Sequence, residues 1–93
     1  LFFERRTKMK EFTIKVNDAS GIHARPAGLL VKEASKYESS ITLVHNGKSA
    51  DAKRIFSVMG LAAKYGDTLK ITVHGSDEEK AAESLKAFFE NNL

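Results

Sequence analysis

Apolar and polar residues alternate along three stretches of the chain, and this period of two is typical of half-buried β-strands. The alternation predicts strands over residues 12–16, 41–45 and 69–73. Asn46-Gly47 follows the second strand, and this dipeptide favours a tight hairpin turn because both of its positions tolerate positive φ. Residues 48–52 are therefore predicted to return as a fourth, weaker strand.

Between the strands, apolar residues recur every three or four positions, which is the spacing of amphipathic helices. The first such stripe consists of Ala27, Leu30, Val31, Ala34 and Tyr37. Pro26 fits the first turn of this helix, so the helix is predicted to begin near His23 or Ala24. A second stripe predicts a short helix over 55–62, with Gly66 as a possible left-handed cap.

Ser76 is predicted to open a third helix, because Ser76 and Glu79 have the spacing of a capping box. The predicted order of elements is therefore β-α-β-β-α-β-α. Half-buried strands and three amphipathic helices indicate an α+β protein, in which the helices pack on one face of an antiparallel sheet.

Length and composition narrow the possible functions. The chain has 93 residues, enough for one domain, and it contains no cysteine, which excludes disulfides and cysteine-ligated metals. The net charge is +3, but residues 1–8 alone contribute +2, and no basic stripe with interleaved aromatic residues follows. We therefore expect no nucleic-acid binding. No apolar run is long enough for a membrane span. Residues 1–8 are interpreted as an N-terminal extension, followed by one domain over residues 9–93.

The candidate chemistry lies where the first helix begins, at His23 and Arg25. A helix start presents free N–H groups and a partial positive charge, so it attracts anions such as phosphate. A neutral imidazole there can act as a nucleophile, and an arginine supplies forked donors for phosphoryl oxygens. This arrangement can accept a phosphoryl group, although a histidine near a helix start is also often a cap or a solvated side chain.

The same heptapeptide resembles the active-site signature of HPr, the histidine-containing phosphocarrier family of the bacterial sugar phosphotransferase system. The residues that carry the resemblance are Gly21-Ile22-His23-Ala24-Arg25-Pro26-Ala27, together with Asn46-Gly47-Lys48, Ala52-Lys53 and Ser76-Asp77-Glu78-Glu79. The resemblance extends from Met9 to the C-terminus. It implies an open-faced β-sandwich, a four-stranded antiparallel sheet with three helices on one face.

The resemblance also implies the roles of individual residues. His23 would take a phosphoryl group on Nδ1 from phosphorylated enzyme I and pass it to an enzyme IIA domain, and Arg25 would help to hold and release it. Ser20, Ala24 and Pro26 would belong to the cradle around the phosphoryl group. The protein would be a cytoplasmic monomer without a cofactor, and a carrier rather than a free-standing enzyme.

Partners are expected to dock on an apolar surface beside the histidine, formed by Phe56 and Leu61 with Arg54 as an added cation. This follows from the resemblance, because Phe56 and Leu61 match positions of the apolar patch that the first two helices form in family members. In many Gram-positive members a serine that is phosphorylated by a dedicated kinase stands where this chain has Arg54. Ser57 lies nearly a helical turn away and should not substitute, so we expect this regulatory branch to be absent.

Two alternatives remain open at this stage. The first is a nitrogen-related or regulatory paralogue within the same family, which His23 does not distinguish from a sugar carrier. The second is a regulatory binding domain on the same fold with an idle His23, although a pure binder has no need of both His23 and Arg25. His45 and His74 are interpreted as residues at strand ends, and no metal site is expected because neither has a carboxylate at ligand spacing.

Overall fold

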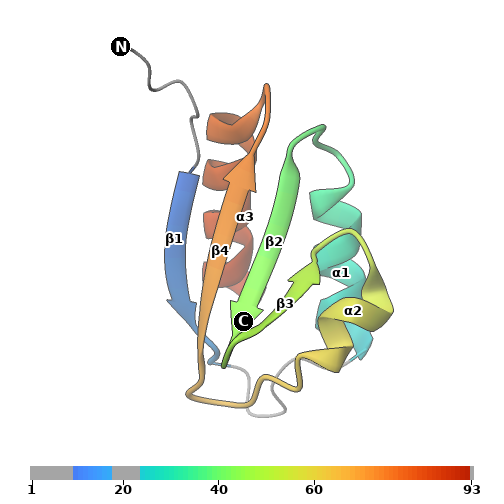
Figure 1. Cartoon of the computed structure of the whole chain (residues 1–93), viewed down its shortest axis with the longest axis vertical. Coiled ribbons are helices and arrows are strands. Elements are labelled where there is room, and N and C mark those ends of the chain that lie inside the picture. Colours follow the sequence, from blue (N-terminus) through green and yellow to red (C-terminus); the bar gives the residue numbers. More distant parts are fainter. Residues whose placement is uncertain (1–9, 18–23, 93) are drawn as a thin grey trace.

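The computed structural model describes residues 10–17 and 24–92. Within them the chain forms four strands and three helices in the order β-α-β-β-α-β-α (Figure 1). The elements are β1 (Lys10–Lys15), α1 (Ala24–Ala34), β2 (Ser40–His45), β3 (Lys48–Asp51), α2 (Ile55–Gly60), β4 (Thr68–His74) and α3 (Glu78–Asn92). The predicted order of elements is confirmed.

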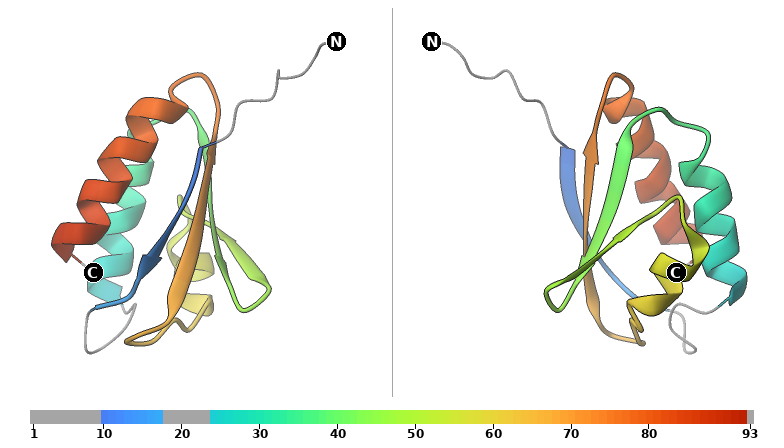
Figure 2. Two further views of the ribbon diagram at one scale, coloured as in Figure 1. Left: turned by 90° about the vertical axis from the view of Figure 1, so that its left-hand side faces the viewer. Right: turned by 45° about the vertical axis from the view of Figure 1, so that its right-hand side comes forward.

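The strands form one antiparallel sheet in the order β1-β4-β2-β3. Residues directly opposite each other share a face of the sheet, so the pairs Phe12–Ile71 and Leu43–Ile71 point to the same side. The helices cover that side and leave the other face open (Figure 2). The prediction of an α+β, open-faced β-sandwich with three helices on one face is therefore confirmed.

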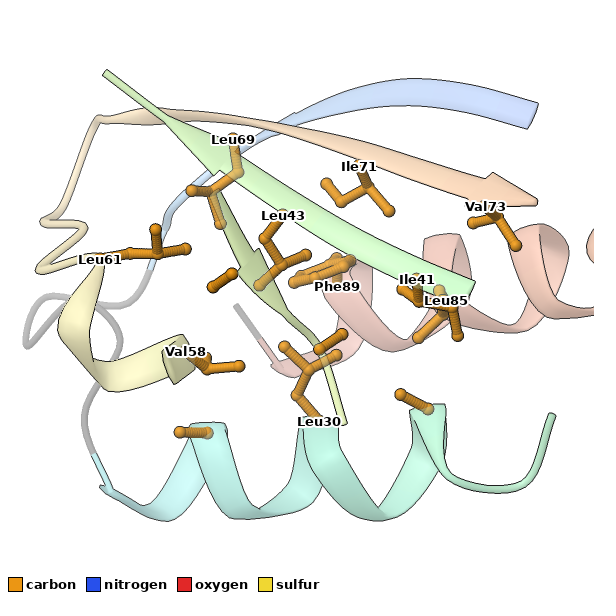
Figure 3. Packing of buried hydrophobic residues seen from close by; sticks show 14 of the residues in the cluster. Leu30, Ile41, Leu43, Val58, Leu61, Leu69, Ile71, Val73, Leu85 and Phe89 are labelled. Atoms are coloured by element: carbon orange, nitrogen blue, oxygen red, sulfur yellow. The ribbon is translucent and has the colours of Figure 1, made fainter. Parts of the chain in front are cut away.

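The hydrophobic core lies between the sheet and the helices (Figure 3). Its fully buried side chains come from every layer, because period-two positions in the strands face period-3.6 stripes in the helices. They include Leu30 of α1, Leu43 of β2, Val58 of α2, Ile71 of β4 and Leu85 of α3. One continuous core holds all three helices on the sheet.

The turn between β2 and β3 follows the prediction made from Asn46-Gly47. Both residues have positive φ, 49° at Asn46 and 80° at Gly47. Two successive left-handed residues are the backbone of a type I′ turn, whose twist matches that of the paired strands. The turn thus sets the β2–β3 register, in which His45 lies opposite Lys48.

The predicted helix ends are less accurate. Helix α2 ends at Gly60 with Leu61 as its C-cap, so the expected cap at Gly66 is wrong, although Gly66 does have the expected left-handed backbone (φ 87°). The expected N-cap at Ser76 is also wrong: α3 begins at Glu78, and Ala81 N donates to the carbonyl of Asp77. The Asp77 carboxylate accepts hydrogen bonds from the backbone N–H groups of Glu38 and Ser39, which ties the start of α3 to the residues before β2.

Candidate functional site

Helix α1 begins where the sequence placed its start, with Ala24, Arg25 and Pro26 as its first three residues. Pro26 is buried in the first turn, where its missing N–H leaves no hydrogen bond unmade. The first turn contains no acidic residue. The partial positive charge of the helix start is therefore not compensated by a carboxylate on the same turn, which favours an anion at this end.

His23 and Ser20 lie outside the described residues. Their predicted roles, and those of Ala24, Arg25 and Pro26 around a phosphoryl group, remain predictions. The described part of the chain defines the two supports of this segment: the end of β1 on one side and the first turn of α1 on the other.

The end of β1 is fixed by two backbone hydrogen bonds beyond the ladder. Gly66 N donates to the Val16 carbonyl and Val16 N donates to the Asp67 carbonyl, both at 2.8 Å. The Val16 side chain is fully buried. The loop that follows α2 thus holds the chain just before residues 18–23.

Helices α1 and α2 pack against each other beside the start of α1 (Figure 2). Gly28 faces this contact, and a Cβ at its position would lie 3.8 Å from Ile55 Cδ1, an ordinary van der Waals distance, so the packing does not depend on a glycine there. Phe56 of α2 is 84% exposed, and Leu29 of α1 is 42% exposed. Arg54, the residue before α2, is also exposed. The two helices therefore present apolar side chains and a cation to solvent.

Leu61 is not part of this exposed surface, and the expectation that it is exposed is wrong. It is only 3% exposed and belongs to the core. Its N–H donates to the Val58 carbonyl, so the chain continues for one tighter turn after α2 and directs Leu61 inward, as it does Val58. The spacing of three from Val58 was the sequence signal for this burial. Leu29 is the exposed residue that the sequence reasoning missed, and its position outside the α1 stripe was the signal.

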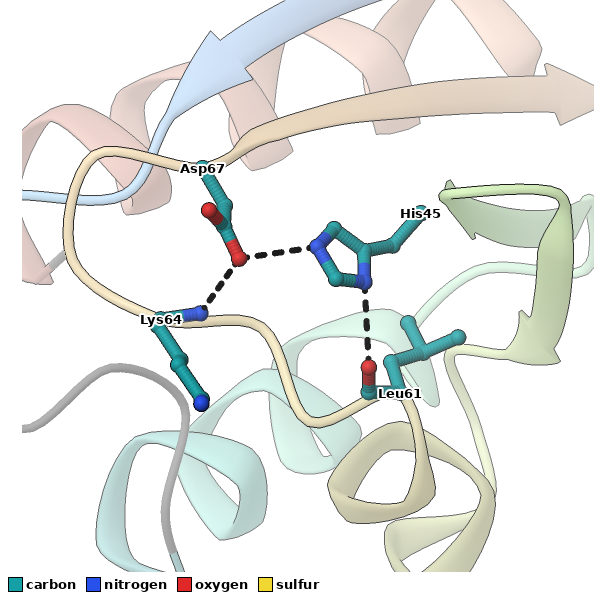
Figure 4. Close-up of polar contacts among 4 residues, drawn as sticks. All are labelled: His45, Leu61, Lys64 and Asp67. Atoms are coloured by element: carbon teal, nitrogen blue, oxygen red, sulfur yellow. Dashed lines mark hydrogen bonds and ion pairs between the residues drawn. The ribbon is translucent and has the colours of Figure 1, made fainter.

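His45, Leu61, Lys64 and Asp67 form a cluster of polar contacts at the C-terminal end of β2 (Figure 4). His45 is the last residue of β2 and His74 the last of β4, as interpreted from the sequence. The His45 ring, however, is buried, with Nδ1 3.0 Å from the Leu61 carbonyl oxygen and Nε2 2.9 Å from Asp67 Oδ2. The Lys64 backbone N–H bond first, and the His45 bond second, hold the pKa of Asp67 below its ordinary value.

Fold and motif together place the chain in the class of small phosphocarrier domains. The family model described as "PTS HPr component phosphorylation site" matches residues 10–91, so the chain belongs to the HPr family of the phosphotransferase system. The family's role is phosphoryl transfer within that system, through interaction with its enzymes. Among the described residues, no helix has the length and apolar character needed to cross a membrane.

Individual relatives agree with this placement. The chain is 45% identical over 75 residues to phosphocarrier protein HPr of Buchnera aphidicola subsp. Baizongia pistaciae. This alignment covers 81% of this chain and 88% of the relative. The solved structure of a Mycoplasma histidine-containing phosphocarrier protein superposes with a TM-score of 0.85 at 38% identity, over 88% of this chain and 93% of that one. Crh of Bacillus subtilis, a catabolite-repression protein described as a swapped dimer, gives a TM-score of 0.73 at 35% identity, over 86% and 92%.

Proposed function

We propose that His23 is the phosphoryl acceptor of this protein. It takes the group on Nδ1 from phosphorylated enzyme I and donates it to an enzyme IIA domain for sugar uptake. The observation that carries the proposal is the sequence Gly21–Ala27 in a chain of the HPr family, placed so that α1 begins at the residue after His23. The site of action is the cytoplasm, and the working form is a monomer.

The transfer requires no cofactor. The imidazole lone pair of His23 forms the new P–N bond while the bond between phosphorus and the donor breaks, and the second transfer reverses these roles. The first-turn N–H groups of α1 and the helix dipole stabilise the phosphoryl oxygens. Arg25 adds a fixed cation, Ser20, Ala24 and Pro26 complete the cradle, and Pro26 contributes no competing donor.

Enzyme I and enzyme IIA dock on what we call the α1–α2 surface, formed by Leu29, Arg54 and Phe56. Exposed aromatic and aliphatic side chains beside a cation are typical of interfaces in which a few anchors contribute most of the binding energy. Arg54 favours an acidic partner surface, because complementary charge speeds association. The exposure of Phe56 and Leu29 on two helices that pack together supports this proposal.

The test is the intact-protein mass after incubation with phosphoenolpyruvate and enzyme I. We expect a single acid-labile phosphoryl gain in the parent protein and in His74→Ala, which removes an exposed histidine at the end of β4. His23→Ala should gain nothing. A phosphoryl group that persists in His23→Ala and disappears in His74→Ala would refute the assignment to His23.

A regulatory role like that of Crh is the second candidate, and the structural similarity to Crh favours it. A binding domain that signals without phosphorylation has no use for the His23 and Arg25 pair. A His23→Ala variant that retains every activity of the protein in cells would support this candidate, whereas loss of sugar uptake would support the carrier. A nitrogen-related paralogue would accept phosphate from a different enzyme I and leave sugar uptake unchanged.

A further inference from the structure

Tyr65 is an exposed aromatic residue that the α1–α2 surface does not include. Within the described residues, the large apolar or aromatic side chains that remain exposed are Leu29, Phe56 and Tyr65. The first two belong to the α1–α2 surface. Tyr65 lies in the loop between α2 and β4, and 65% of its surface is in contact with solvent. The fold thus covers only a small part of this ring.

Tyr65 lies at the tip of a tight turn over residues 64–67. The Asp67 N–H donates to the Lys64 carbonyl at 2.9 Å, which closes the turn, and the Lys64 N–H donates to the Asp67 carboxylate, also at 2.9 Å. Gly66 has a φ of 87°, the value that a type II turn requires at its third position. Tyr65 therefore occupies the second position of the turn, and its backbone is fixed on both sides.

Contacts with the rest of the fold hold this turn in place. Gly66 N donates to the Val16 carbonyl and Val16 N donates to the Asp67 carbonyl, both at 2.8 Å. On the other side of the turn, the side chains of Leu61 and Ala63 are buried in the core. An aromatic side chain on a fixed backbone loses little conformational freedom when a partner covers it, because only two χ angles become restricted.

The turn lies at the end of the molecule where the His23 motif leads into α1. Figure 1 and Figure 2 show that the end of β1, the start of α1 and the loop after α2 come together at this end. A protein interface of standard size covers about 800 Å² on each partner, which is a patch about 16 Å in radius. A partner centred between the end of β1 and the start of α1 therefore reaches this turn as well as α2.

The turn presents the same chemistry as the α1–α2 surface. The Lys64 side chain is exposed and points away from the Asp67 carboxylate (Figure 4). Tyr65 with Lys64 is an aromatic ring beside a cation, as is Phe56 with Arg54. Tyrosine is enriched among the residues that anchor protein interfaces, and a neighbouring cation favours an acidic partner.

We propose that Lys64 and Tyr65 form a second docking patch for enzyme I, with Tyr65 as its anchor. Enzyme I seated over His23 covers this patch and the α1–α2 surface together, so it contacts both α2 and the turn that holds the end of β1. The inference rests on the proposed function, because it takes enzyme I as the partner of His23. Tyr65 contacts the partner and not the phosphoryl group, so its loss weakens the complex without slowing the transfer step.

Fluorine NMR tests the contact directly. The chain contains two tyrosines, Tyr37 and Tyr65, so protein labelled with fluorotyrosine gives two ¹⁹F signals, and Tyr65→Phe identifies them by removing one. Tyr37 is half-buried beyond the C-terminal end of α1 and is the internal control. Enzyme I should shift or broaden the Tyr65 signal and leave the Tyr37 signal unchanged. A Tyr65 signal that does not respond, or that responds only to an enzyme IIA domain, would overturn the proposal.

Phosphorylation kinetics give a second, independent test. Tyr65→Ser should keep the parent free energy of unfolding, because the ring is mostly in solvent. Its KM in phosphorylation by enzyme I should rise about 5- to 30-fold with kcat unchanged, whereas Tyr65→Phe, which keeps the ring, should stay within about threefold of the parent. His74→Ala, an exposed change at the end of β4, should keep the parent KM.

The possible results distinguish this inference from the carrier role. Equal KM values for the parent and Tyr65→Ser would remove Tyr65 from the interface and leave the assignment of His23 intact. If enzyme I does not phosphorylate the parent, the proposed function fails and the docking patch fails with it. A marked loss of stability in Tyr65→Ser would assign the ring to the fold and contradict its role as an anchor.

Discussion

Phe56 and Leu61 lie five residues apart, and the sequence assigned both to one partner surface, but the structure separates them. Phe56 has only about a sixth of its surface covered, whereas Leu61 is 3% exposed. An aromatic side chain buries about 200 Å² when fully covered. At about 25 cal/mol per Å², the small covered part of Phe56 contributes less than about 1 kcal/mol to folding. Leu61→Ala, by contrast, should cost about 2–5 kcal/mol, because it removes buried methyl groups and leaves a cavity.

The assay is a pair of measurements on each variant. Urea denaturation should place Phe56→Ala within about 1 kcal/mol of the parent and lower the free energy of unfolding of Leu61→Ala by at least about 2 kcal/mol. Phosphorylation by enzyme I should show the reverse order. Loss of an interface anchor worth about 1–2 kcal/mol raises KM about 5- to 30-fold for Phe56→Ala, and Leu61→Ala, assayed where it is folded, should keep a KM near that of the parent.

Two results would refute this reasoning at different points. Equal destabilisation by Phe56→Ala and Leu61→Ala would mean that the assigned burial of these residues is wrong. A clear difference in stability combined with an unchanged KM for Phe56→Ala would leave the fold intact and remove Phe56 from the proposed docking surface.

Three further changes have defined outcomes. Gly75→Ala should lower the denaturation midpoint by an amount corresponding to about 1–3 kcal/mol, because its Cβ would lie 2.6 Å from the Ser39 backbone. Hydrogen bonds from Ser39 hold the pKa of Asp77 low, so the ionised carboxylate stabilises the fold above about pH 4, and this stabilisation is lost as the pH falls. Asp77→Asn should therefore lower Tm relative to the parent at pH 6, and the difference in Tm between the two proteins should become smaller near pH 2. A serine kinase that acts on HPr proteins should label neither Arg54 nor Ser57 in the parent, whereas Arg54→Ser should gain one phosphate, and any label on parent Ser57 would contradict the prediction.

The strands and the turn between β2 and β3 were predictable because local rules decide them. Alternation at Phe12 and Ile14 matches the face that packs on the helices, and Asn46-Gly47 can adopt the two positive φ values that the turn needs. The class of protein was also predictable, since the His23 motif lies in a short, contiguous segment. The role of His23 itself stays a prediction.

The remaining features depend on contacts between residues far apart in the sequence. The burial of His45 follows from Leu61 and Asp67, which approach it only after α2 and its loop have folded. The contacts at the start of α3 are of the same kind, because Asp77 accepts a hydrogen bond from the backbone of Ser39, 38 residues earlier in the chain. The local pattern of one sequence does not indicate which distant residues will meet in the fold. From that pattern alone, His45 was interpreted as a residue at a strand end and Ser76 as a helix cap.

Strand β1 lies at the edge of the sheet and pairs only with β4, near the far end of the chain. During synthesis on the ribosome, β1 therefore emerges first and waits without a partner until residues 68–74 have left the exit tunnel. Pairs formed across so much sequence make folding slower than local pairs do. A chain that ends before Gly66 has neither the β4 partner of β1 nor the hydrogen bond from Gly66 to Val16. The order of strands therefore makes the anchoring of β1, which leads into the segment that contains His23, depend on residues fifty or more positions further along the chain.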